Sequence, residues 1–286
     1  MLGFKARKSW RVVELTDCPL SDPHLTAALP ALAKVAAPFL GHPKSAPTLH
    51  VTLTDTGLDV DVTGVEKRSG GLNGDQLALA IAAAAEADLA RLSLDGDTLV
   101  MARQPRVRFG RASVPLPAGG FLQASPAAEA AMVERAVEAV RGAKKVADLF
   151  CGAGTFTFPL AEIASVTAAD SAAASIAALK AGVGTAQGLK GIEAQARDLF
   201  RRPLSPYDLK GCEAIVLDPP RAGALEQTQQ LPGTKASVVV GVSCNPQTFA
   251  RDARVLVDAG FRLEKVTPID QFIWSTHIEL VGVFRR

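Results

Sequence analysis

The sequence predicts an α/β fold: a doubly wound, mostly parallel sheet whose last strand is antiparallel, preceded by a smaller α+β domain. From residue 119 to residue 286, short apolar runs alternate with helical segments, as they do in parallel sheets with crossover helices. Residues 1–118 combine alternating strand patterns with an Ala-rich helix. A length of 286 residues suits about two domains, so we expect domains at 1–118 and 119–286. The Pro- and Gly-rich segment 113–120 is the predicted boundary.

The first domain is expected to hold a β-hairpin and a long helix. Residues 48–54 and 57–63 alternate apolar and polar side chains, and a short turn ending in Gly57 joins them. Residues 10–16 also predict a strand. Residues 75–91 consist of strong helix formers and predict a helix.

The second domain is expected to contain buried strands separated by helices. The predicted strands are 146–150, 165–169, 214–217 and 236–242, and the predicted helices are 126–141, 172–181 and 246–259. The last two strands, 261–267 and 278–284, have no helix between them, so they must pair antiparallel. A parallel sheet that ends in an antiparallel hairpin is typical of the Rossmann-like sheet of class I methyltransferases rather than of dehydrogenases.

Composition excludes several classes of protein. Hydrophobic residues make up 48% and charged residues 21% of the chain, which is globular usage and excludes wholesale disorder. No window approaches the roughly 18 uncharged apolar residues that a membrane span needs, and the N-terminus does not resemble a signal peptide. The four cysteines lack the spacing of metal fingers or disulfide frameworks, which favours a reducing compartment. We therefore expect a cytoplasmic protein.

The charge is nearly balanced, with 31 Lys and Arg against 29 Asp and Glu and a formal net charge of +2. Such a balance does not by itself indicate a nucleic-acid-binding protein. Two local clusters of basic residues stand out: Lys5, Arg7, Lys8 and Arg11, and Arg103, Arg106, Arg108 and Arg111. Each cluster is equally compatible with a solvated surface and with a surface that follows nucleic-acid phosphates.

A glycine-rich segment, Asp148-Leu-Phe-Cys-Gly-Ala-Gly-Thr-Phe156, follows the first strand of the second domain. Its two glycines allow a sharp turn beneath a ligand, and the next helix directs free N–H groups at that ligand. Thr155 and its neighbours stand where the dinucleotide motif has its third glycine, so the pattern is not that motif. Asp170 ends the second strand, where an acid can accept hydrogen bonds from a ribose diol. Together these features predict a nucleoside-bearing cofactor at the carboxyl ends of the strands.

Three further motifs lie at strand ends. Leu217-Asp-Pro-Pro-Arg-Ala-Gly223 follows the fourth strand, and its prolines stiffen a loop that aims Asp218 into the crevice. Val242-Ser-Cys-Asn-Pro246 follows the fifth strand, where the dipole of the next helix can lower the pKa of the Cys244 thiol. Thr276-His-Ile-Glu279 enters the last strand, and an acid in an apolar strand is costly to bury outside a polar site.

These segments, in this order, resemble the RNA 5-methyluridine (uracil-C5) methyltransferases, the family of the bacterial ribosomal-RNA and transfer-RNA uracil-C5 enzymes. The match includes Phe121-Leu-Gln123, the glycine-rich segment and the Asp-Pro-Pro-Arg segment. It also includes Ser-Cys-Asn-Pro-x-Thr-x-Ala-Arg-Asp at 243–252 and the final His-x-Glu. The resemblance spans residues 119–286 strongly and the first 118 loosely. Each motif alone is only suggestive, whereas the ordered set is highly specific.

The resemblance implies methyl transfer from S-adenosylmethionine to uracil C5 in RNA, with Cys244 adding to C6 and Glu279 removing the C5 proton. Covalent addition is chemically reasonable because uracil C5 is too weak a nucleophile to attack a sulfonium unaided. A positioned base would contribute roughly 10²–10⁴-fold to the elimination. The residues implied to line the cofactor site are Gln123, Phe150, Gly152, Thr155, Asp170, Asp198 and Asp218.

The chain departs from the family pattern in two motifs: Gln-x-Asn is Gln123-Ala-Ser125 here, and Phe-Pro-x-Thr is Phe272-Ile-Trp-Ser275. Many ribosomal-RNA members also carry an N-terminal OB-like RNA-binding domain and an iron–sulfur cluster held by four cysteines. Cys18 resembles the last of these ligands, and the sequence lacks the other three. One cysteine cannot hold a cluster, so we expect no iron–sulfur cluster and no other metal. Cys151 and Cys212 are expected to be buried structural residues.

Three alternatives stay open: a transfer-RNA target, an RNA cytosine-C5 methyltransferase and a catalytically inactive RNA-binding relative. Cytosine-C5 enzymes typically place a cysteine beside the proline of the fourth-strand motif, where this chain has Arg221. Retention of both Cys244 and Glu279 argues against an inactive relative. We expect an RNA partner, with 23S ribosomal RNA favoured by Cys18, a monomeric state and no membrane association.

Overall fold

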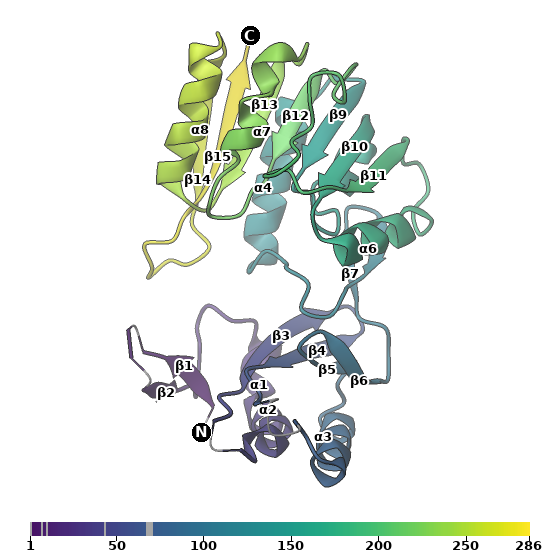
Figure 1. Cartoon of the computed structure of the whole chain (residues 1–286), viewed down its shortest axis with the longest axis vertical. Coiled ribbons are helices and arrows are strands. Elements are labelled where there is room, and N and C mark those ends of the chain that lie inside the picture. The colour runs from purple at the N-terminus through teal and green to yellow at the C-terminus, as the bar shows by residue number, and fades with distance from the viewer. Residues whose placement is uncertain (1, 7, 10, 43, 67–70) are drawn as a thin grey trace. The chain divides into compact units, whose positions relative to one another are not determined.

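The computed structural model describes residues 2–6, 8–9, 11–42, 44–66 and 71–286. Its contacts divide the chain into two compact units, both drawn in Figure 1. The first unit comprises Met1–Val107 and Leu116–Gly120, and the second comprises Arg108–Pro115 and Phe121–Arg286. The segment 108–115 therefore packs with the second unit, although it falls within the first expected domain, 1–118.

The first unit is built on a four-stranded sheet in the order β3-β4-β5-β6. Its strands are β3 (Thr48–Thr54), β4 (Gly57–Thr63), β5 (Arg91–Leu94) and β6 (Asp97–Met101), and β1 (Gly3–Lys5) pairs with β2 (Val12–Glu14) in a separate hairpin. Its helices are α1 (Pro23–Ala27), α2 (Leu29–Ala36), the 3-10 helix η1 (Ala37–Leu40) and α3 (Gly74–Glu86). The antiparallel β3–β4 hairpin is confirmed with its predicted bounds. The core buries Val60 and Leu92 of the sheet against Val35 and Phe39 of the helices.

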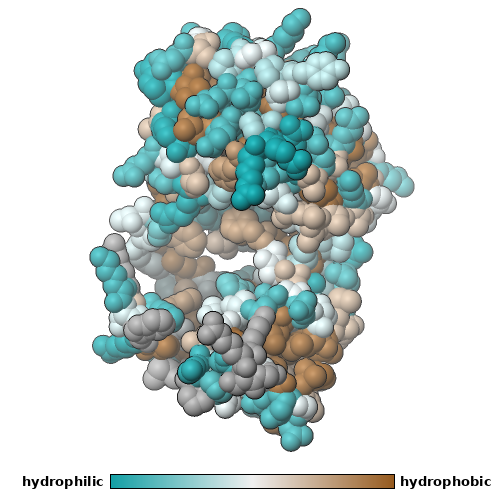
Figure 2. All heavy atoms as spheres, in the orientation of Figure 1, coloured by the Kyte–Doolittle hydropathy of each residue, from teal (hydrophilic) through white to brown (hydrophobic). Residues whose placement is uncertain are grey.

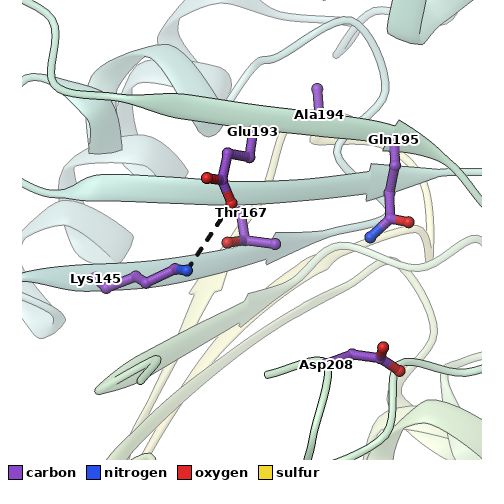
Figure 3. Close-up of a pocket in the computed structure, with 6 residues that line it drawn as sticks. All are labelled: Lys145, Thr167, Glu193, Ala194, Gln195 and Asp208. Carbon is purple, nitrogen blue, oxygen red and sulfur yellow. Dashed lines mark ion pairs between the residues drawn. The ribbon is translucent and has the colours of Figure 1, made fainter. Parts of the chain in front are cut away.

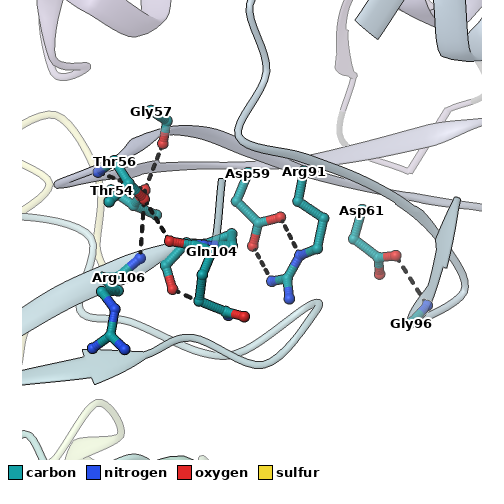
Figure 4. A network of polar contacts seen from close by, with 10 residues as sticks. Thr54, Thr56, Gly57, Asp59, Asp61, Arg91, Gly96, Gln104 and Arg106 are labelled. Carbon is teal, nitrogen blue, oxygen red and sulfur yellow. Dashed lines mark hydrogen bonds and ion pairs between the residues drawn. The ribbon is translucent and has the colours of Figure 1, made fainter. Parts of the chain in front are cut away.

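Polar contacts also hold this sheet together (Figure 4). Arg91 donates through Nε and Nη2 to the two carboxylate oxygens of Asp59, at 2.8 and 2.5 Å, and both side chains are buried. The backbone N–H of Gly96 donates to Asp61 Oδ1 at 2.9 Å. Because each buried charge of the Asp59–Arg91 pair is satisfied by the other, removing one partner alone would be costly.

The predicted helix 75–91 is too long at its C-terminal end. α3 stops at Glu86, and Asp88 has a left-handed φ of 49°, which a continuing helix does not allow. Arg91 instead opens β5, where its guanidinium pairs with a carboxylate of β4. The sequence prediction also lacks β5 and β6, although the Asp95-Gly96 turn between them is a hairpin signal.

Two arginines of the second basic cluster, Arg103 and Arg111, make contacts with other residues of the protein. Arg103 donates to the backbone oxygens of Thr56 and Asp88 and to Asp88 Oδ1, at 2.7–2.8 Å. Arg111 lies 3.3 Å from the carboxylate of Glu162. These two guanidinium groups therefore stabilise loops of their own units.

The extreme N-terminal predictions are only partly described. Residues 12–14 of the predicted strand 10–16 form β2. Trp10 of that strand and Arg7 of the first basic cluster lie outside the described residues.

The second unit holds a seven-stranded sheet in the order β11-β10-β9-β12-β13-β15-β14. Its strands are β9 (Lys145–Leu149), β10 (Ser165–Asp170), β11 (Ile192–Ala196), β12 (Ala214–Leu217), β13 (Val238–Ser243), β14 (Arg262–Ile269) and β15 (Glu279–Arg285). Its helices are α4 (Pro126–Ala139), α5 (Thr157–Ala161), α6 (Ala173–Val183), α7 (Leu225–Thr228), the 3-10 helix η2 (Leu231–Gly233) and α8 (Pro246–Asp258). The strands from β9 to β13 pair in parallel, and β15 runs antiparallel to both β13 and β14. This topology confirms the predicted fold class.

A short hairpin, β7 (Arg106–Phe109) and β8 (Ala112–Pro115), carries the segment that packs with the second unit. The backbone N–H of Ser113 donates to Thr185 Oγ1 at 2.9 Å, just after α6. A Cβ added at Gly182 of α6 would lie 2.7 Å from Val114 Cγ2, so β8 and α6 pack closely. β8 thus packs against α6 of the second unit.

Hydrophilic and apolar side chains are interspersed on the face shown in Figure 2. Among the described residues, no helix has the length and apolar character needed to cross a membrane.

Candidate active site

The predicted site residues converge at one edge of the second unit's sheet. Asp148 lies in β9, Asp170 ends β10, and Asp218 and Cys244 directly follow β12 and β13. The carboxyl ends of parallel strands meet at a single edge, which is where open α/β sheets bind ligands. Glu279 begins β15, whose antiparallel direction brings its amino end beside the carboxyl end of β13.

The strand register brings Cys244 and Glu279 to neighbouring positions. Ser243 pairs with Leu280 in the β13–β15 ladder, so the next residues outward are Cys244 and Glu279. The electrostatics agree, because the Glu279 carboxylate raises the pKa of the Cys244 thiol. Two residues far apart in sequence thus lie side by side at this edge.

The Cys244 thiol is half-buried, and its pKa lies above the ordinary value. Burial is the largest cause; Glu279 and Asp218 raise the pKa further, while the guanidinium of Arg221 lowers it. The predicted lowering of this pKa is therefore wrong in its net sign. The predicted helix α8 does begin just after the cysteine, at Pro246, but burial and the neighbouring carboxylates outweigh the groups that favour the thiolate.

Glu279 is only 9% exposed, and its carboxylate is not left without a partner. Gln271 Nε2 donates to Glu279 Oε1 at 3.0 Å. Burial raises the pKa of Glu279, whereas the Gln271 hydrogen bond and the nearby His277 lower it. The Gln271 amide supplies the polar partner that the sequence predicts for this buried acid.

The glycine-rich segment turns sharply after β9. Phe150, Gly152 and Gly154 have φ values of 64°, 54° and 112°, all in the region that favours glycine. The N–H of Gly152 donates to Asp170 Oδ2 at 3.0 Å, and the N–H of Ala172 donates to Asp170 Oδ1 at 2.8 Å. The predicted ribose acceptor therefore also fixes the turn and the start of α6.

Asp148, in β9, bonds to a residue on the other side of the glycine-rich turn. Thr157 Oγ1 donates to its Oδ2 at 2.5 Å, whereas its buried Oδ1 has no hydrogen-bond partner among the described residues. Burial, with a contribution from Asp170, raises the pKa of Asp148 to about 7. A Cβ built on Gly152 meets no atom within 4 Å, so there is open space over the turn. An acidic edge with an unsatisfied carboxylate oxygen and an open glycine turn fits a cationic, nucleoside-bearing ligand.

Asp218 lies near the acids of β9 and β10 and also near Glu279 of β15. Burial raises its pKa to about 8, with further contributions from Asp148, Glu279 and Asp170. Gln123 Nε2 lies 3.4 Å from Asp218 Oδ2, so the predicted residue before α4 does reach the site. The remaining predicted cofactor residues lie at the margins of this edge, where Thr155 and Asp198 are half-buried.

Asp198 lies after β11 and shapes its own loop. Its Oδ1 accepts hydrogen bonds from the N–H groups of Phe200 and Arg201, at 3.0 and 3.1 Å. The ring of Phe200 packs against the ring of Phe150 at a centroid distance of 5.5 Å. The loop after β11 is thereby tied to the glycine-rich turn.

The loops after β12 and β13 are bound tightly to each other. The backbone oxygen of Arg221 accepts from Asn245 Nδ2 at 3.0 Å and Thr248 Oγ1 at 3.3 Å. Farther along α8, Arg251 and Asp252 bond the backbone of the residues that follow Arg221. Gly223, with a φ of 80°, lies so close to α8 that an added Cβ would be 2.5 Å from Arg251 Nη2. The Ser-Cys-Asn-Pro-x-Thr-x-Ala-Arg-Asp motif thus holds the Asp-Pro-Pro-Arg loop in place.

Comparison with known proteins agrees with this arrangement. The sequence profile of the tRNA (Uracil-5-)-methyltransferase family matches residues 72–286. An uncharacterized RNA methyltransferase of Caulobacter vibrioides is 63% identical over 285 residues, covering 100% of this chain and 69% of the relative. The 23S rRNA (uracil(1939)-C(5))-methyltransferase RlmD of Vibrio parahaemolyticus is 28% identical, covering 99% of this chain and 65% of that protein.

The chain belongs to the uracil-5-methyltransferase family. The resemblance and the enzyme class predicted from the motifs are thereby confirmed. Among solved structures, the Pyrococcus abyssi tRNA (uracil-54, C5)-methyltransferase in complex with S-adenosyl-L-homocysteine shares the fold, with a TM-score of 0.72 at 21% identity. That comparison covers 99% of this chain and 72% of the other.

The departures from the family motifs have different structural consequences. Ser125, in place of the usual Asn, is the N-cap of α4, and its Oγ accepts from the N–H of Ala128 at 3.4 Å. Serine and asparagine are both good N-caps, so this change keeps the capping role. Ile273 and Trp274, by contrast, are 57% and 69% exposed in the loop before Glu279.

Cys151 and Cys212 are buried, as expected, with exposures of 3% and 2%. Within the described ranges, no group of three or more His, Cys, Asp or Glu side chains is placed to hold a metal ion. Cys18 is a free, partly exposed thiol in the first unit.

Two residues that bond to the predicted site residues, Thr157 and Gln271, are not among the predictions. Thr157 is hidden because its bond to Asp148 spans a turn whose shape the sequence does not give. Gln271 is hidden because its partner lies on the far side of a loop. A polar side chain eight residues before the predicted base was the available signal, and it is weak.

A hollow of about 310 Å³ lies elsewhere on this sheet (Figure 3). Its lining residues are Lys145, Thr167, Glu193, Ala194, Gln195 and Asp208. Lys145 Nζ and Glu193 Oε2 are 3.9 Å apart within it. None of the predicted catalytic or cofactor residues lines this hollow.

Proposed function

We propose that this chain methylates C5 of a uridine in RNA through covalent addition of Cys244 to C6, with S-adenosylmethionine as the methyl donor. The observation that carries the proposal is the placement of Cys244 and Glu279 at neighbouring register positions of β13 and β15. An addition–elimination reaction needs a nucleophile and a base on one ring, and these two side chains come from the last two motifs of the family's set.

The proposed reaction begins with the thiolate of Cys244. Its attack forms the C6–S bond and moves the C5=C6 electron pair toward O4, which makes C5 a nucleophile. S-adenosylmethionine, when bound, would supply a methyl group activated by its sulfonium. C5 would take this methyl group as the methyl–sulfur bond breaks and the sulfur keeps the electron pair, so that S-adenosylhomocysteine leaves and C5 carries both the new methyl and its original proton.

Glu279 is proposed to complete the reaction as the base. Its carboxylate takes the C5 proton, the C5–H electron pair re-forms the C5=C6 bond, and the C6–S bond breaks to release the Cys244 thiolate. Arg221 favours this thiolate electrostatically, since its guanidinium lowers the pKa of Cys244. A target uridine must be unpaired or flipped out for both residues to reach it.

The cofactor is proposed to lie over the glycine-rich turn. The residues that would hold it are Gln123, Phe150, Gly152, Thr155, Asp170, Asp198 and Asp218. Two observations support this placement. A Cβ built on Gly152 meets no atom within 4 Å, and Asp148 Oδ1 has no hydrogen-bond partner among the residues that the structure describes. A buried acidic edge favours a ligand that carries positive charge at its sulfonium and amino groups.

The RNA target is proposed to be ribosomal, with transfer RNA as the alternative. Similarity to RlmD along nearly the whole chain supports a ribosomal target, whereas the fold neighbour of Pyrococcus abyssi is a tRNA enzyme. We further propose that the first unit contacts the RNA and that the protein acts as a cytoplasmic monomer.

Tritium release from C5-labelled uridine in RNA tests the proposed chemistry. Wild-type protein with S-adenosylmethionine should release tritium, and Cys244→Ala should release none while it still binds the cofactor by calorimetry. Release from C5-labelled cytidine instead would show a cytosine enzyme, and release by Cys244→Ala would refute the covalent mechanism.

A further inference from the structure

Gln271 is attached to Glu279 across the loop that joins β14 and β15. Ile269 pairs with Glu279 in the ladder, so Gln271 is only two residues beyond the last strand pair. Its Nε2 donates to Glu279 Oε1 at 3.0 Å. Its own Oε1 is buried and has no hydrogen-bond partner within the part of the chain that the structure describes. The Gln271 amide therefore has its donor bonded to the Glu279 carboxyl group, while its acceptor lies nearby without a hydrogen bond among the described residues.

Hydrogen bonds within the loop that joins β14 and β15 hold the backbone on both sides of Gln271 and Glu279. Asp270 Oδ1 accepts from the N–H of Phe272 at 3.0 Å, and the N–H of Ser275 donates to the backbone oxygen of Phe272 at 2.7 Å. The N–H of His277 donates to Ser275 Oγ at 2.9 Å just before Glu279. These turns close the loop at both ends and leave its apolar tip exposed.

We propose that Gln271 is a positioning residue that holds Glu279 both before and after proton removal. This inference rests on the proposed function. Before the step, the amide N–H donates to the carboxylate, as observed. After the carboxylate has taken the C5 proton, rotation of the amide presents Oε1 as an acceptor for the new O–H group. The base then keeps one orientation in both of its protonation states.

The charged groups around Glu279 make this role consequential. Cys244 and Asp218 face it from the loops after β13 and β12, and His277 lies on its own loop beside Arg221, with the two side-chain nitrogens 3.5 Å apart. Burial raises the pKa of Glu279, and the Gln271 hydrogen bond is the larger of the two groups that lower it. Without this bond the pKa of Glu279 is higher, so a smaller fraction of the base is ionised at any given pH within its titration range.

Single-turnover reactions with C5-tritiated RNA test the proposal, using Gln271→Met and Gln271→Glu. Methionine keeps the side-chain length but removes the donor, and glutamate adds a second negative charge. We expect proton removal to slow roughly tenfold or more, within the range a positioned base supplies. The acid limb of the pH–rate profile should move to higher pH in the order wild type, Gln271→Met, Gln271→Glu. The methylated RNA–protein adduct should accumulate because methyl transfer precedes the affected step.

The matched control is Gln229→Met, which makes the same substitution at an exposed position at the end of α7. It should retain the wild-type rate and pH profile, and thermal denaturation of all variants checks that they are folded. A folded Gln271→Met with a wild-type pH profile and no accumulated adduct would overturn the role of Gln271. If instead the wild-type protein releases no tritium, the proposed function itself fails.

Discussion

At the scale of single residues, the site is a group of acids and one thiol whose protonation states depend on each other. Burial raises the pKa of Asp148 to about 7 and that of Asp218 to about 8. The Cys244 thiol has a raised pKa for the same first reason. Clusters of ionisable groups with shifted pKa values are frequent at functional sites.

Alkylation of Cys244 by iodoacetamide should report its electrostatic surroundings. The thiolate is the reactive form, so alkylation should rise with pH through a pKa above the ordinary value. Glu279→Gln removes a negative neighbour and should move the curve to lower pH, whereas Arg221→Gln should move it to higher pH. Mass spectrometry of the Cys244 peptide measures the rate at each pH.

Glu138→Gln is the matched control, since it removes the same charge from an exposed position at the end of α4. Its alkylation curve should coincide with that of the wild type. If the curve is unchanged in both Glu279→Gln and Arg221→Gln, the charges of these two side chains do not influence the pKa of the Cys244 thiol.

At the scale of elements, sequence patterns predict strands well where burial alone determines them. The strand at 214–217 has its predicted bounds because its four residues are all buried and apolar. The helix at 75–91 is predicted too long because the pairing of Arg91 with Asp59 is a tertiary contact that local helix propensity does not contain. Strand ends place Asp218 and Cys244 at one edge from sequence alone, but the adjacency of Cys244 and Glu279 depends on the register of β13 with β15.

The contact between the Asp-Pro-Pro-Arg loop and α8 should tolerate no side chain at Gly223. Gly223→Ala places a methyl group at a φ of 80° and within 3 Å of Arg251, Asp252 and Thr248 atoms. We expect a destabilisation of about 1–3 kcal/mol and a loss of activity beyond it, because the loop that carries Asp218 and Arg221 must move. Thermal or urea denaturation measures the first effect.

Gly184→Ala provides the comparison for this substitution. Gly184 has a φ of −72°, and a Cβ there meets no atom within 4 Å. Its stability should change by less than about 0.5 kcal/mol. Equal effects of the two substitutions would contradict the close packing at Gly223.

At the scale of the whole molecule, the division into two units separates the proposed chemistry from the proposed RNA contact. The predicted catalytic and cofactor residues lie in the second unit, together with the 108–115 segment. The expected boundary at 118/119 rests on the Pro- and Gly-rich composition of residues 113–120, and that composition does not reveal that β8 packs on α6.

Two fragments test this organisation. A fragment of residues 108–286 keeps the contact between β8 and α6, whereas a fragment of 119–286 exposes it. We expect the longer fragment to melt several degrees higher, as about 1 kcal/mol of packing would produce in a domain of this size. Both should lose RNA affinity relative to the whole chain, measured by filter binding at a fixed salt concentration. Equal melting temperatures would contradict the packing of the segment, and undiminished RNA affinity would contradict the proposed role of the first unit.

Cys244 and Glu279 are proposed to act on the same pyrimidine ring. RNA containing 5-fluorouridine tests this directly, because a base cannot remove fluorine from C5 as it removes a proton. Incubation with S-adenosylmethionine should trap a denaturation-resistant, methylated RNA adduct that peptide mass mapping places on Cys244. On ordinary RNA, Glu279→Gln should accumulate the corresponding methylated adduct, which keeps its proton at C5, and Cys18→Ala should behave as the wild type. An adduct on another residue, or none with wild-type protein that binds the RNA, would contradict the account.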